Sequence, residues 1–281
     1  MPLFRRVTII GLGLIGGSLG MALKKQGVAR GVCGVARKAS TIRRAVARKA
    51  IDRGTVRLAE VLEGADLVVI ATPPAAVEKV ARRVVAHTRH RFILMDVAST
   101  KKEIVSSVER MLPSRIAFVG SHPMAGSEQS GISAADPKLF QGAPCVVTRT
   151  PKTNPRALAK VSALWRALGG RVVVLDPFSH DQRVAQVSHV PHLVAAGLML
   201  SADSSARRLA AGGFADTTRV ALSDPQLWGQ VCMTNRREIL RALDRFLYRI
   251  GELRVMLNEG DAAGLRRRLA QARQRRRRVR R

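Results

Sequence analysis

Val7-Thr-Ile-Ile-Gly11-Leu-Gly13-Leu-Ile-Gly16-Gly17 is the stretch that decides the fold. It begins as a β-branched apolar run, turns at glycines and continues into a helical pattern that reaches Leu23. A strand, a glycine turn and a helix are the context in which the spacing Gly-x-Gly-x-x-Gly marks a dinucleotide site. Gly11 permits the tight turn, Gly13 lets the backbone approach a pyrophosphate, and Gly16 lets the helix pack closely on the strand. We therefore predict that a dinucleotide cofactor binds here.

The residues expected to contact this cofactor belong to the glycine turn and to the ends of two later strands. They are Gly11, Leu12, Gly13, Leu14, Ile15, Gly16, Ala36, Arg37, Thr72 and Pro73. A site for NAD usually has an acid about 20 residues after the last motif glycine, where it binds the ribose hydroxyls. This chain has Ala36 followed by Arg37 there, so no carboxylate repels a 2′-phosphate and an arginine is present to pair with it. We therefore expect NADP as the preferred cofactor. NAD is the alternative if Arg37 faces solvent and does not contact the cofactor.

Apolar runs and helical windows alternate through the first part of the chain. The runs cover residues 31–35, 66–71, 92–95, 117–119 and 172–175, and the helical windows cover 40–50, 76–86, 101–111 and 156–168. This alternation predicts the α/β class, with a Rossmann-type, doubly wound, mainly parallel sheet. Ligands of such sheets bind beyond the carboxyl ends of the strands, where Thr72, Ser99 and His122 fall.

The length of 281 residues suggests two domains. The strand pattern stops after Asp176, and helical spacing follows as far as Asn258. We predict a dinucleotide-binding domain at residues 1–176, an all-helical substrate and dimerisation domain at 177–264, and a disordered arginine-rich tail at 265–281. The apolar stripe that includes Leu240 and Leu247 exceeds what a small helical domain buries alone, which predicts a homodimer through this domain.

The net charge of +29 is extreme, and the last stretch carries many arginines and no acid. Such a block is typical of a solvated, self-repelling tail. It also raises the alternative of a nucleic-acid-binding protein with a redundant nucleotide fold. No aromatic residues are interleaved with the arginines, so nucleic acid is not the expected partner.

The apolar stretch near the start imitates a signal peptide, but glycines interrupt it and a lysine pair closes it. No other window approaches the roughly 18 to 20 uninterrupted apolar residues of a membrane span. Cys33, Cys145 and Cys232 are odd in number and widely spaced, which supports neither a disulfide framework nor a zinc site. We expect a soluble, cytoplasmic protein without a membrane or metal partner.

Further motifs follow the glycine turn in order along the chain. They are Asp96-Val-Ala-Ser-Thr-Lys101, Ser121-His-Pro-Met-Ala-Gly-Ser-Glu128, Ser188-His-Val-Pro-His192, Gly212-Gly-Phe-Ala-Asp-Thr-Thr-Arg219, and Asp224-Pro225 with Trp228. Together they resemble the prephenate and arogenate dehydrogenase family of tyrosine biosynthesis. The resemblance implies an NAD(P)-dependent oxidative decarboxylation of a cyclohexadienol, with prephenate as the substrate and 4-hydroxyphenylpyruvate as the product.

The implied chemistry requires a base. Hydride leaves the ring carbon that carries a hydroxyl, so this hydroxyl must lose its proton to a group that titrates near neutrality. His122, after the strand at 117–119, is the candidate base. Ser99 is a candidate to hydrogen-bond the same hydroxyl or to cap the helix that follows. Loss of carbon dioxide needs no metal, because formation of the aromatic ring drives it.

A substrate carboxylate favours an arginine partner. By resemblance, Arg219 binds this carboxylate, Glu128 is a gating acid, and Ser127, His189 and His192 line the substrate site. Along with His180, these two histidines gather near the predicted domain junction. We do not expect His189 and His192 to bind a metal, since no carboxylate or thiol completes a site.

Two enzymatic alternatives remain open at this stage. Arogenate carries an amino acid side chain where prephenate carries a pyruvyl group, and its dehydrogenases share the family motifs. A 3-hydroxyacid dehydrogenase shares the glycine turn but typically depends on a lysine in its helical domain. The helical part of this chain is instead rich in histidine and arginine.

Overall fold

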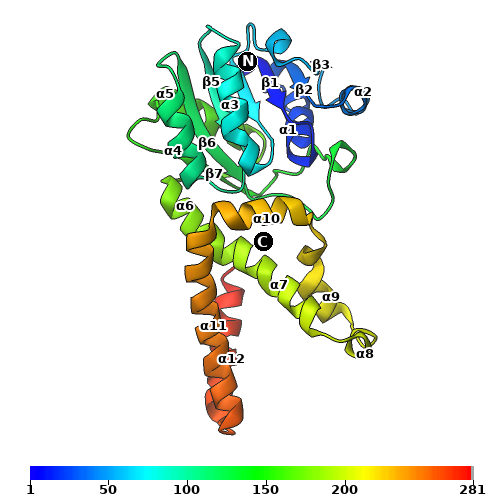
Figure 1. The fold of residues 1–281 in the computed structure, drawn as a ribbon, viewed down its shortest axis with the longest axis vertical. Coiled ribbons are helices and arrows are strands. Elements are labelled where there is room, and N and C mark those ends of the chain that lie inside the picture. The colour runs from blue at the N-terminus through cyan, green and yellow to red at the C-terminus, as the bar shows by residue number, and fades with distance from the viewer. Residues whose placement is uncertain (280–281) are drawn as a thin grey trace.

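The computed structural model describes residues 1–279, which form a sheet domain followed by a helical domain (Figure 1). Eight strands form one sheet in the order β3-β2-β1-β4-β5-β6-β7-β8. The strands are β1 (Phe4–Ile10), β2 (Ala29–Val35), β3 (Arg53–Thr55), β4 (Leu67–Ile70), β5 (Phe92–Asp96), β6 (Ile116–Pro123), β7 (Pro144–Thr148) and β8 (Arg171–Leu175). Strands β1 to β6 run parallel, whereas β7 pairs antiparallel with β6 and parallel with β8. The predicted mainly parallel sheet is confirmed.

Helices cover both faces of this sheet. They are α1 (Leu14–Lys25), α2 (Ala39–Ala47), α3 (Val77–Ala86), α4 (Lys102–Met111) and α5 (Pro155–Ala167). In β4, Leu67 and Val69 join the core under α1, α2 and α5, while Val68 and Ile70 join the core under α3 and α4. A continuous apolar strand is therefore buried on both faces, as in other doubly wound sheets.

The alternating pattern did not predict β7, a five-residue strand at the antiparallel edge, or the three-residue β3. The pairing of Ser121 with Val147 and of His122 with Val146 extends β6 beyond its parallel part. His122 was predicted to follow the strand at 117–119, but it lies within β6 and is held there by β7.

The ends of the parallel strands meet at one edge of the sheet. Ile10 pairs with Ile70, Ile70 with Asp96, and Asp96 with Gly120. The residues that follow these four are therefore neighbours in space. The glycine turn, Thr72, Ser99 and His122 come together at this edge.

The helical domain begins directly after the sheet. Its elements are α6 (Pro177–Val184), a π-helical turn (Ala185–His189), α7 (Val190–Ser201), α8 (Ser204–Arg207), α9 (Gly212–Thr218), a 3₁₀ turn (Arg219–Leu222), α10 (Pro225–Thr234), α11 (Arg236–Asn258) and α12 (Ala262–Arg277). The π turn precedes Pro191, which lacks an N–H and disturbs a regular helix at this point. In Figure 1, α10 lies under the sheet domain and α11 extends away from it.

The helical run Pro177–Ser201 is long and apolar enough, by length and composition, to cross a membrane. In the structure it packs against α4 and α11. Its buried side chains include His180 and Asp181, whose hydrogen bonds reach the sheet domain. These contacts make the run a connection between the two domains.

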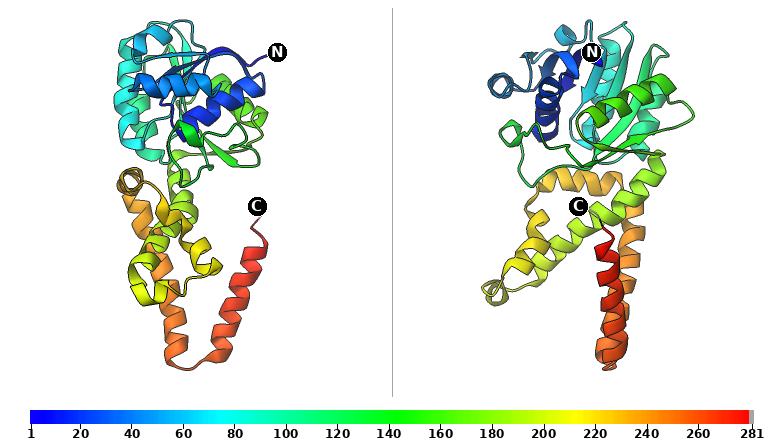
Figure 2. Two further views of the ribbon diagram at one scale, coloured as in Figure 1. Left: turned by 90° about the vertical axis from the view of Figure 1, so that its right-hand side faces the viewer. Right: turned by 180° about the vertical axis from the view of Figure 1, so that it is seen from behind.

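The structure differs from the predicted disordered tail. Residues 262–277 form α12, which folds back beside the far end of α11 (Figure 2). The side chain of Asp261 caps the first turn, and Arg268 donates to Glu252 of α11 at 3.0 Å. Arginine, alanine, leucine and glutamine all favour a helix, which explains why the basic block is ordered here. Residues 280–281 of the predicted tail lie outside the described residues.

Candidate active site

The glycine turn between β1 and α1 is shaped for a phosphate. Gly11 has a φ of +101°, and a Cβ there would lie 2.5 Å from the carbonyl oxygen of Ala71. A Cβ at Gly16 would lie 1.9 Å from the carbonyl oxygen of Gly11, so only glycine allows α1 to approach this closely. Gly13 precedes α1 without a side-chain cap and has open space around its Cβ position. The first N–H groups of α1 are therefore available to a pyrophosphate.

Thr72 adds a polar group to the same edge of the sheet. Its hydroxyl oxygen is buried without a hydrogen-bond partner among the described residues. A buried hydroxyl of this kind fits a site that receives a ligand atom or a water. The glycine turn and Thr72 together fit a dinucleotide.

The other predicted cofactor residues differ in exposure. Leu14, Ile15 and Ala36 are half-buried, Arg37 and Pro73 are exposed, and Leu12 packs its side chain into the core. Leu12 can therefore meet a cofactor only through its backbone.

A buried ion pair lies beside this edge. Lys101 donates through Nζ to Oδ2 of Asp96, and neither side chain is exposed. Burial raises the pKa of Asp96, and the charge of Lys101 opposes this rise. The charge of Lys101 is close enough to His122 to lower the pKa of this histidine.

His122 is the first member of a buried chain of hydrogen bonds. Its Nδ1 lies 2.8 Å from Nε2 of His180 in α6. The Nδ1 of His180 in turn lies 2.7 Å from Oδ1 of Asp181. The carboxylate of Asp181 accepts the backbone N–H groups of Lys101 at 2.7 Å and Lys102 at 2.9 Å. The chain therefore joins the first helical element of the second domain to the start of α4 in the first.

The two histidines of this hydrogen-bond chain, His122 and His180, are neutral at physiological pH. Burial lowers the pKa of His122 well below its ordinary value, and the nearby His180 and Lys101 lower it further. Burial lowers the pKa of His180 to about 2, with a further contribution from the charge of Lys101. A neutral His122 is in the state that a proton acceptor requires.

His189 supplies a donor to the same region. Its Nδ1 accepts from the side-chain amide of Asn235 at 3.2 Å, and this amide also donates to the backbone oxygen of Asp181 at 2.8 Å. Burial lowers the pKa of His189 to about 4, so the ring is neutral with its proton on Nε2. This Nε2 is buried without a partner among the described residues, and can donate to a substrate oxygen.

Trp228 connects the two histidines of the Ser-His-Val-Pro-His motif. His192 stacks on its ring at 3.4 Å with an interplanar angle of 12°, and His189 meets it edge-on at 6.0 Å. The described residues contain no group of three or more His, Cys, Asp or Glu side chains placed to hold a metal ion.

Arg219 and Glu128, predicted respectively to bind the carboxylate and to act as the gate, lie together. A guanidinium nitrogen of Arg219 lies 2.6 Å from Oε2 of Glu128. The arginine side chain is 56% exposed, so this pair contributes little to stability and leaves the guanidinium accessible to a ligand carboxylate. Ser127 is exposed beside the pair, and its hydroxyl accepts the N–H of Gln129 at 3.2 Å.

Ser99 does not cap α4, and this alternative for its role was wrong. The helix has no cap from a neighbouring side chain, because the carboxylate of Asp181 takes that place from the helical domain. Ser99 is half-buried, and its hydroxyl makes no hydrogen bond within the described residues. It remains a candidate to bind the substrate hydroxyl.

Sequence reasoning gave no role to Asp181 or Asn235. Asp181 directly follows His180, and an acid beside a histidine was the one available signal. Asn235 lies in no recognised motif, and only the packing of α11 on α6 brings it to the site.

Comparisons with known proteins agree with this geometry. A family model described as "Prephenate dehydrogenase, nucleotide-binding domain" matches residues 19–174, and one described as "Prephenate dehydrogenase, dimerization domain" matches residues 176–271. The chain is 35% identical to the prephenate dehydrogenase of Bacillus subtilis over 92% of this chain and 72% of that protein.

Two solved structures have the same architecture. Prephenate dehydrogenase from Aquifex aeolicus, in complex with hydroxyphenyl propionate and NAD+, superposes with a TM-score of 0.90 at 29% identity, covering 97% of both chains. Synechocystis arogenate dehydrogenase gives a TM-score of 0.82 at 31% identity, covering 96% of this chain and 98% of that one. The two-domain match, the glycine turn and the site at the domain junction lead to one conclusion: this chain belongs to the prephenate dehydrogenase family.

Proposed function

We propose that this protein is a prephenate dehydrogenase, which oxidises and decarboxylates prephenate to 4-hydroxyphenylpyruvate in tyrosine biosynthesis. The observation that carries the proposal is a buried His122, hydrogen-bonded to His180, at the sheet edge that also bears the glycine turn. Burial lowers the pKa of this histidine, which favours the uncharged ring. An uncharged imidazole beside a dinucleotide site is suited to alcohol oxidation. The proposed reaction takes place in the cytoplasm.

The proton and the hydride of the substrate leave by different routes. The nicotinamide of a dinucleotide held at the glycine turn would supply the hydride acceptor. His122 accepts the hydroxyl proton at Nε2, which has no protein partner among the described residues. Ser99 hydrogen-bonds the same hydroxyl. Loss of the hydride and of the hydroxyl proton turns the C–O bond into a carbonyl. When carbon dioxide leaves, the electron pair of the broken C–C bond moves through the ring onto this oxygen, which takes a proton back from His122 or water, and the ring becomes an aromatic phenol.

The substrate's two acidic groups need fixed partners at some distance from the base. Arg219 binds a carboxylate in place of Glu128, with which it pairs in the structure. The buried Nε2–H of His189 and the ring of His192 supply hydrogen bonds for the pyruvyl group. Neutral hydrogen-bonding groups here suit a keto acid.

Prephenate should be converted with a higher kcat/KM than arogenate. The neutral donor of His189 complements a keto oxygen, whereas the ammonium group of arogenate has only donors to offer. The alternative has support in the similarity to the Synechocystis arogenate dehydrogenase. Purified protein incubated with each substrate and each cofactor, with reduced nicotinamide followed by absorbance, decides between them. A preference for arogenate would contradict this part of the proposal. If the protein converts neither substrate, the proposed function is overturned.

We also propose that NADP is preferred over NAD. Ala36 and Arg37 follow β2 with no acid at either position, and Arg37 is exposed and accessible to a 2′-phosphate. The double variant Ala36→Asp with Arg37→Ala should shift the ratio of kcat/KM toward NAD by about tenfold to a hundredfold, because it removes a charged contact and adds a repulsion. Arg44→Ala, on the exposed side of α2, is the matched control. Equal use of both cofactors by the unchanged protein would remove the basis for this preference.

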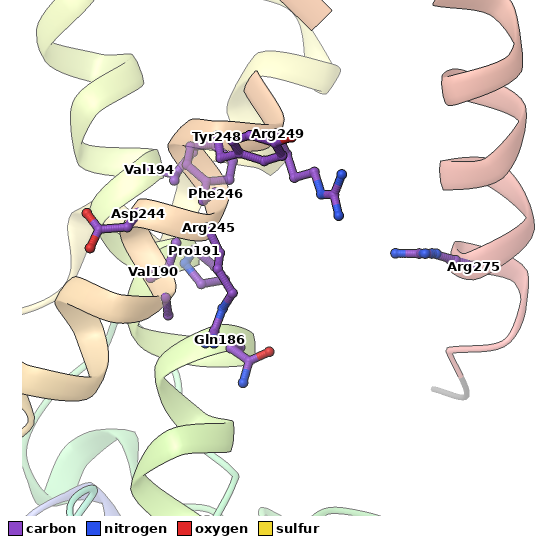
Figure 3. A pocket seen from close by; sticks show the side chains of 11 residues that line it. Gln186, Val190, Pro191, Val194, Asp244, Arg245, Phe246, Tyr248, Arg249 and Arg275 are labelled. Carbon is purple, nitrogen blue, oxygen red and sulfur yellow. The ribbon is translucent and has the colours of Figure 1, made fainter. Parts of the chain in front are cut away.

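The proposed enzyme is a homodimer joined through its helical domain. Several apolar side chains of α11 are left in solvent, among them Leu247 and Ile250, which are 55% and 46% exposed. The same helix also borders an open cavity of about 820 Å³ between α7, α11 and Arg275 of α12. Its lining includes the apolar side chains of Val190, Val194 and Phe246 and the charged ones of Arg245 and Arg249 (Figure 3). Single chains rarely expose an apolar surface of this kind, and a second copy would cover it.

Light scattering should give a mass of twice the 30.5 kDa of one chain. The double variant Leu247→Glu with Ile250→Glu should give monomers, because it places two charges in the apolar contact. Val46→Glu is the matched control, since Val46 is 41% exposed on α2 of the sheet domain. A monomeric unchanged protein at micromolar concentration would contradict the dimer.

A further inference from the structure

Asp181 has three hydrogen-bond partners. The backbone N–H groups of Lys101 and Lys102 at the start of α4 can only donate, one to each carboxylate oxygen, and the third partner is Nδ1 of His180. The positive end of the helix dipole favours an anion at this place. Burial raises the pKa of Asp181, while the two N–H groups and the charge of Lys101 hold it down. With an N–H donor on each oxygen at a helix N-terminus, the carboxylate is ionised and has no proton to give to His180.

The direction of each hydrogen bond follows from that starting point. Because Asp181 accepts, Nδ1 of the neutral His180 carries the ring proton and its Nε2 carries a lone pair. The 2.8 Å contact between this Nε2 and Nδ1 of His122 then requires the proton to belong to His122. A neutral imidazole has one ring proton, so Nε2 of His122 is left unprotonated.

Building on the proposed function, we propose that Asp181 and His180 are positioning residues. They hold His122 in the tautomer with its proton on Nδ1, and so direct the lone pair of Nε2 to the substrate hydroxyl. In the opposite tautomer His122 would present an N–H to the hydroxyl and could not take its proton. The proton accepted at Nε2 leaves His122 as an imidazolium whose Nδ1–H still donates to His180.

The charged and titratable groups around His122 fit this assignment. Lys101 acts on it by charge and His189 is neutral, and neither makes a hydrogen bond to its ring among the described residues. Within residues 1–279, His180 is the one residue that hydrogen-bonds the ring of His122, and the two rings meet at an interplanar angle of 64°. The tautomer of His122 therefore depends on His180 and, through it, on Asp181.

Nitrogen NMR of the imidazole rings tests the proposal without any turnover. The chain has six histidines, and the His122 signals are identified by their loss in His122→Asn. Two-bond proton–nitrogen correlation spectra of the unchanged protein at neutral pH should show His122 protonated at Nδ1 and His180 protonated at Nδ1. A His122 ring protonated at Nε2 would overturn the proposal.

Two substitutions at His180 separate positioning from folding. His180→Leu removes the acceptor, so His122 should become a mixture of tautomers and kcat should fall by about tenfold to a hundredfold with little change in KM. His180→Gln keeps a side-chain carbonyl that can accept from Nδ1 of His122, and should restore most of kcat and the Nδ1–H signal. His87→Gln, at an exposed histidine that ends α3, is the matched control.

The outcomes distinguish this proposal from the proposed function. An unchanged protein that turns over neither substrate but shows His122 protonated at Nδ1 supports the hydrogen-bond assignment while the function fails. An active protein in which a folded His180→Leu keeps both kcat and the His122 tautomer overturns the positioning role alone. Circular dichroism and the melting temperature report whether each variant is folded, and the spectrum of the unchanged protein needs no variant.

Discussion

His122→Asn should lower kcat by about 10² to 10⁴, with a much smaller change in KM. Asparagine keeps a hydrogen-bonding side chain but cannot accept the substrate proton. In the unchanged enzyme, activity requires the neutral ring, so kcat/KM should fall as the pH falls through the pKa of His122. Burial lowers this pKa well below its ordinary value, which places the acidic limb below about pH 6.5. The limb should be absent from the variant.

Steady-state kinetics as a function of pH measures both effects. His87→Asn, at an exposed position, is the control and should behave as the unchanged enzyme. A His122→Asn enzyme with near-normal kcat and the same acidic limb would refute the assignment. The base would then have to be one of the other three site histidines, His180, His189 or His192.

Arg219→Ala should raise KM for prephenate by about tenfold to a hundredfold and change kcat little. A charge-assisted contact to a carboxylate is worth about 1.5 to 3 kcal/mol, and this one exists in the bound substrate as well as in the transition state. An interaction of equal strength in both states affects binding and not the chemical step. The same variant frees Glu128 from its only ion-pair partner among the described residues.

Initial rates over a range of prephenate concentrations separate the two constants. Arg82→Ala is the matched control, because Arg82 is an exposed arginine paired with an acid, Glu78, on α3 and far from the site. A fall in kcat with unchanged KM would instead assign Arg219 to the transition state, contrary to this prediction.

The sequence predicted the sheet well where each strand is buried on both faces. β4 is an uninterrupted apolar run, and its alternate residues pack into two separate cores. The prediction missed β7, which is a strand because it pairs with β6 and β8 and not because of its own sequence pattern. It failed again for α12, where helix propensity, the cap from Asp261 and the bond to Glu252 outweigh the repulsion between arginines.

The site was predicted in its residue types and only partly in its connections. His122 and Arg219 lie in motifs that are short in sequence and contiguous in space. Asp181 lies in α6 and Asn235 directly before α11, and their partners in the structure include residues far along the chain. A local pattern carries no information about such pairs, because they depend on how the helical domain packs against the sheet domain.

Asp181 belongs to the helical domain, and its carboxylate caps the N-terminus of α4 in the sheet domain. A rotation that opened the two domains would break the bonds of Asp181 to Lys101 and Lys102 and the bond between His180 and His122. It would also expose the start of α4. These buried hydrogen bonds therefore oppose opening of the domain junction. The ion pair of Glu128 and Arg219 also links the two domains, but its arginine is more than half exposed to solvent. In a chimera that exchanged the helical domain for that of a relative, the incoming domain would have to bring an equivalent acid to keep the base in its active form.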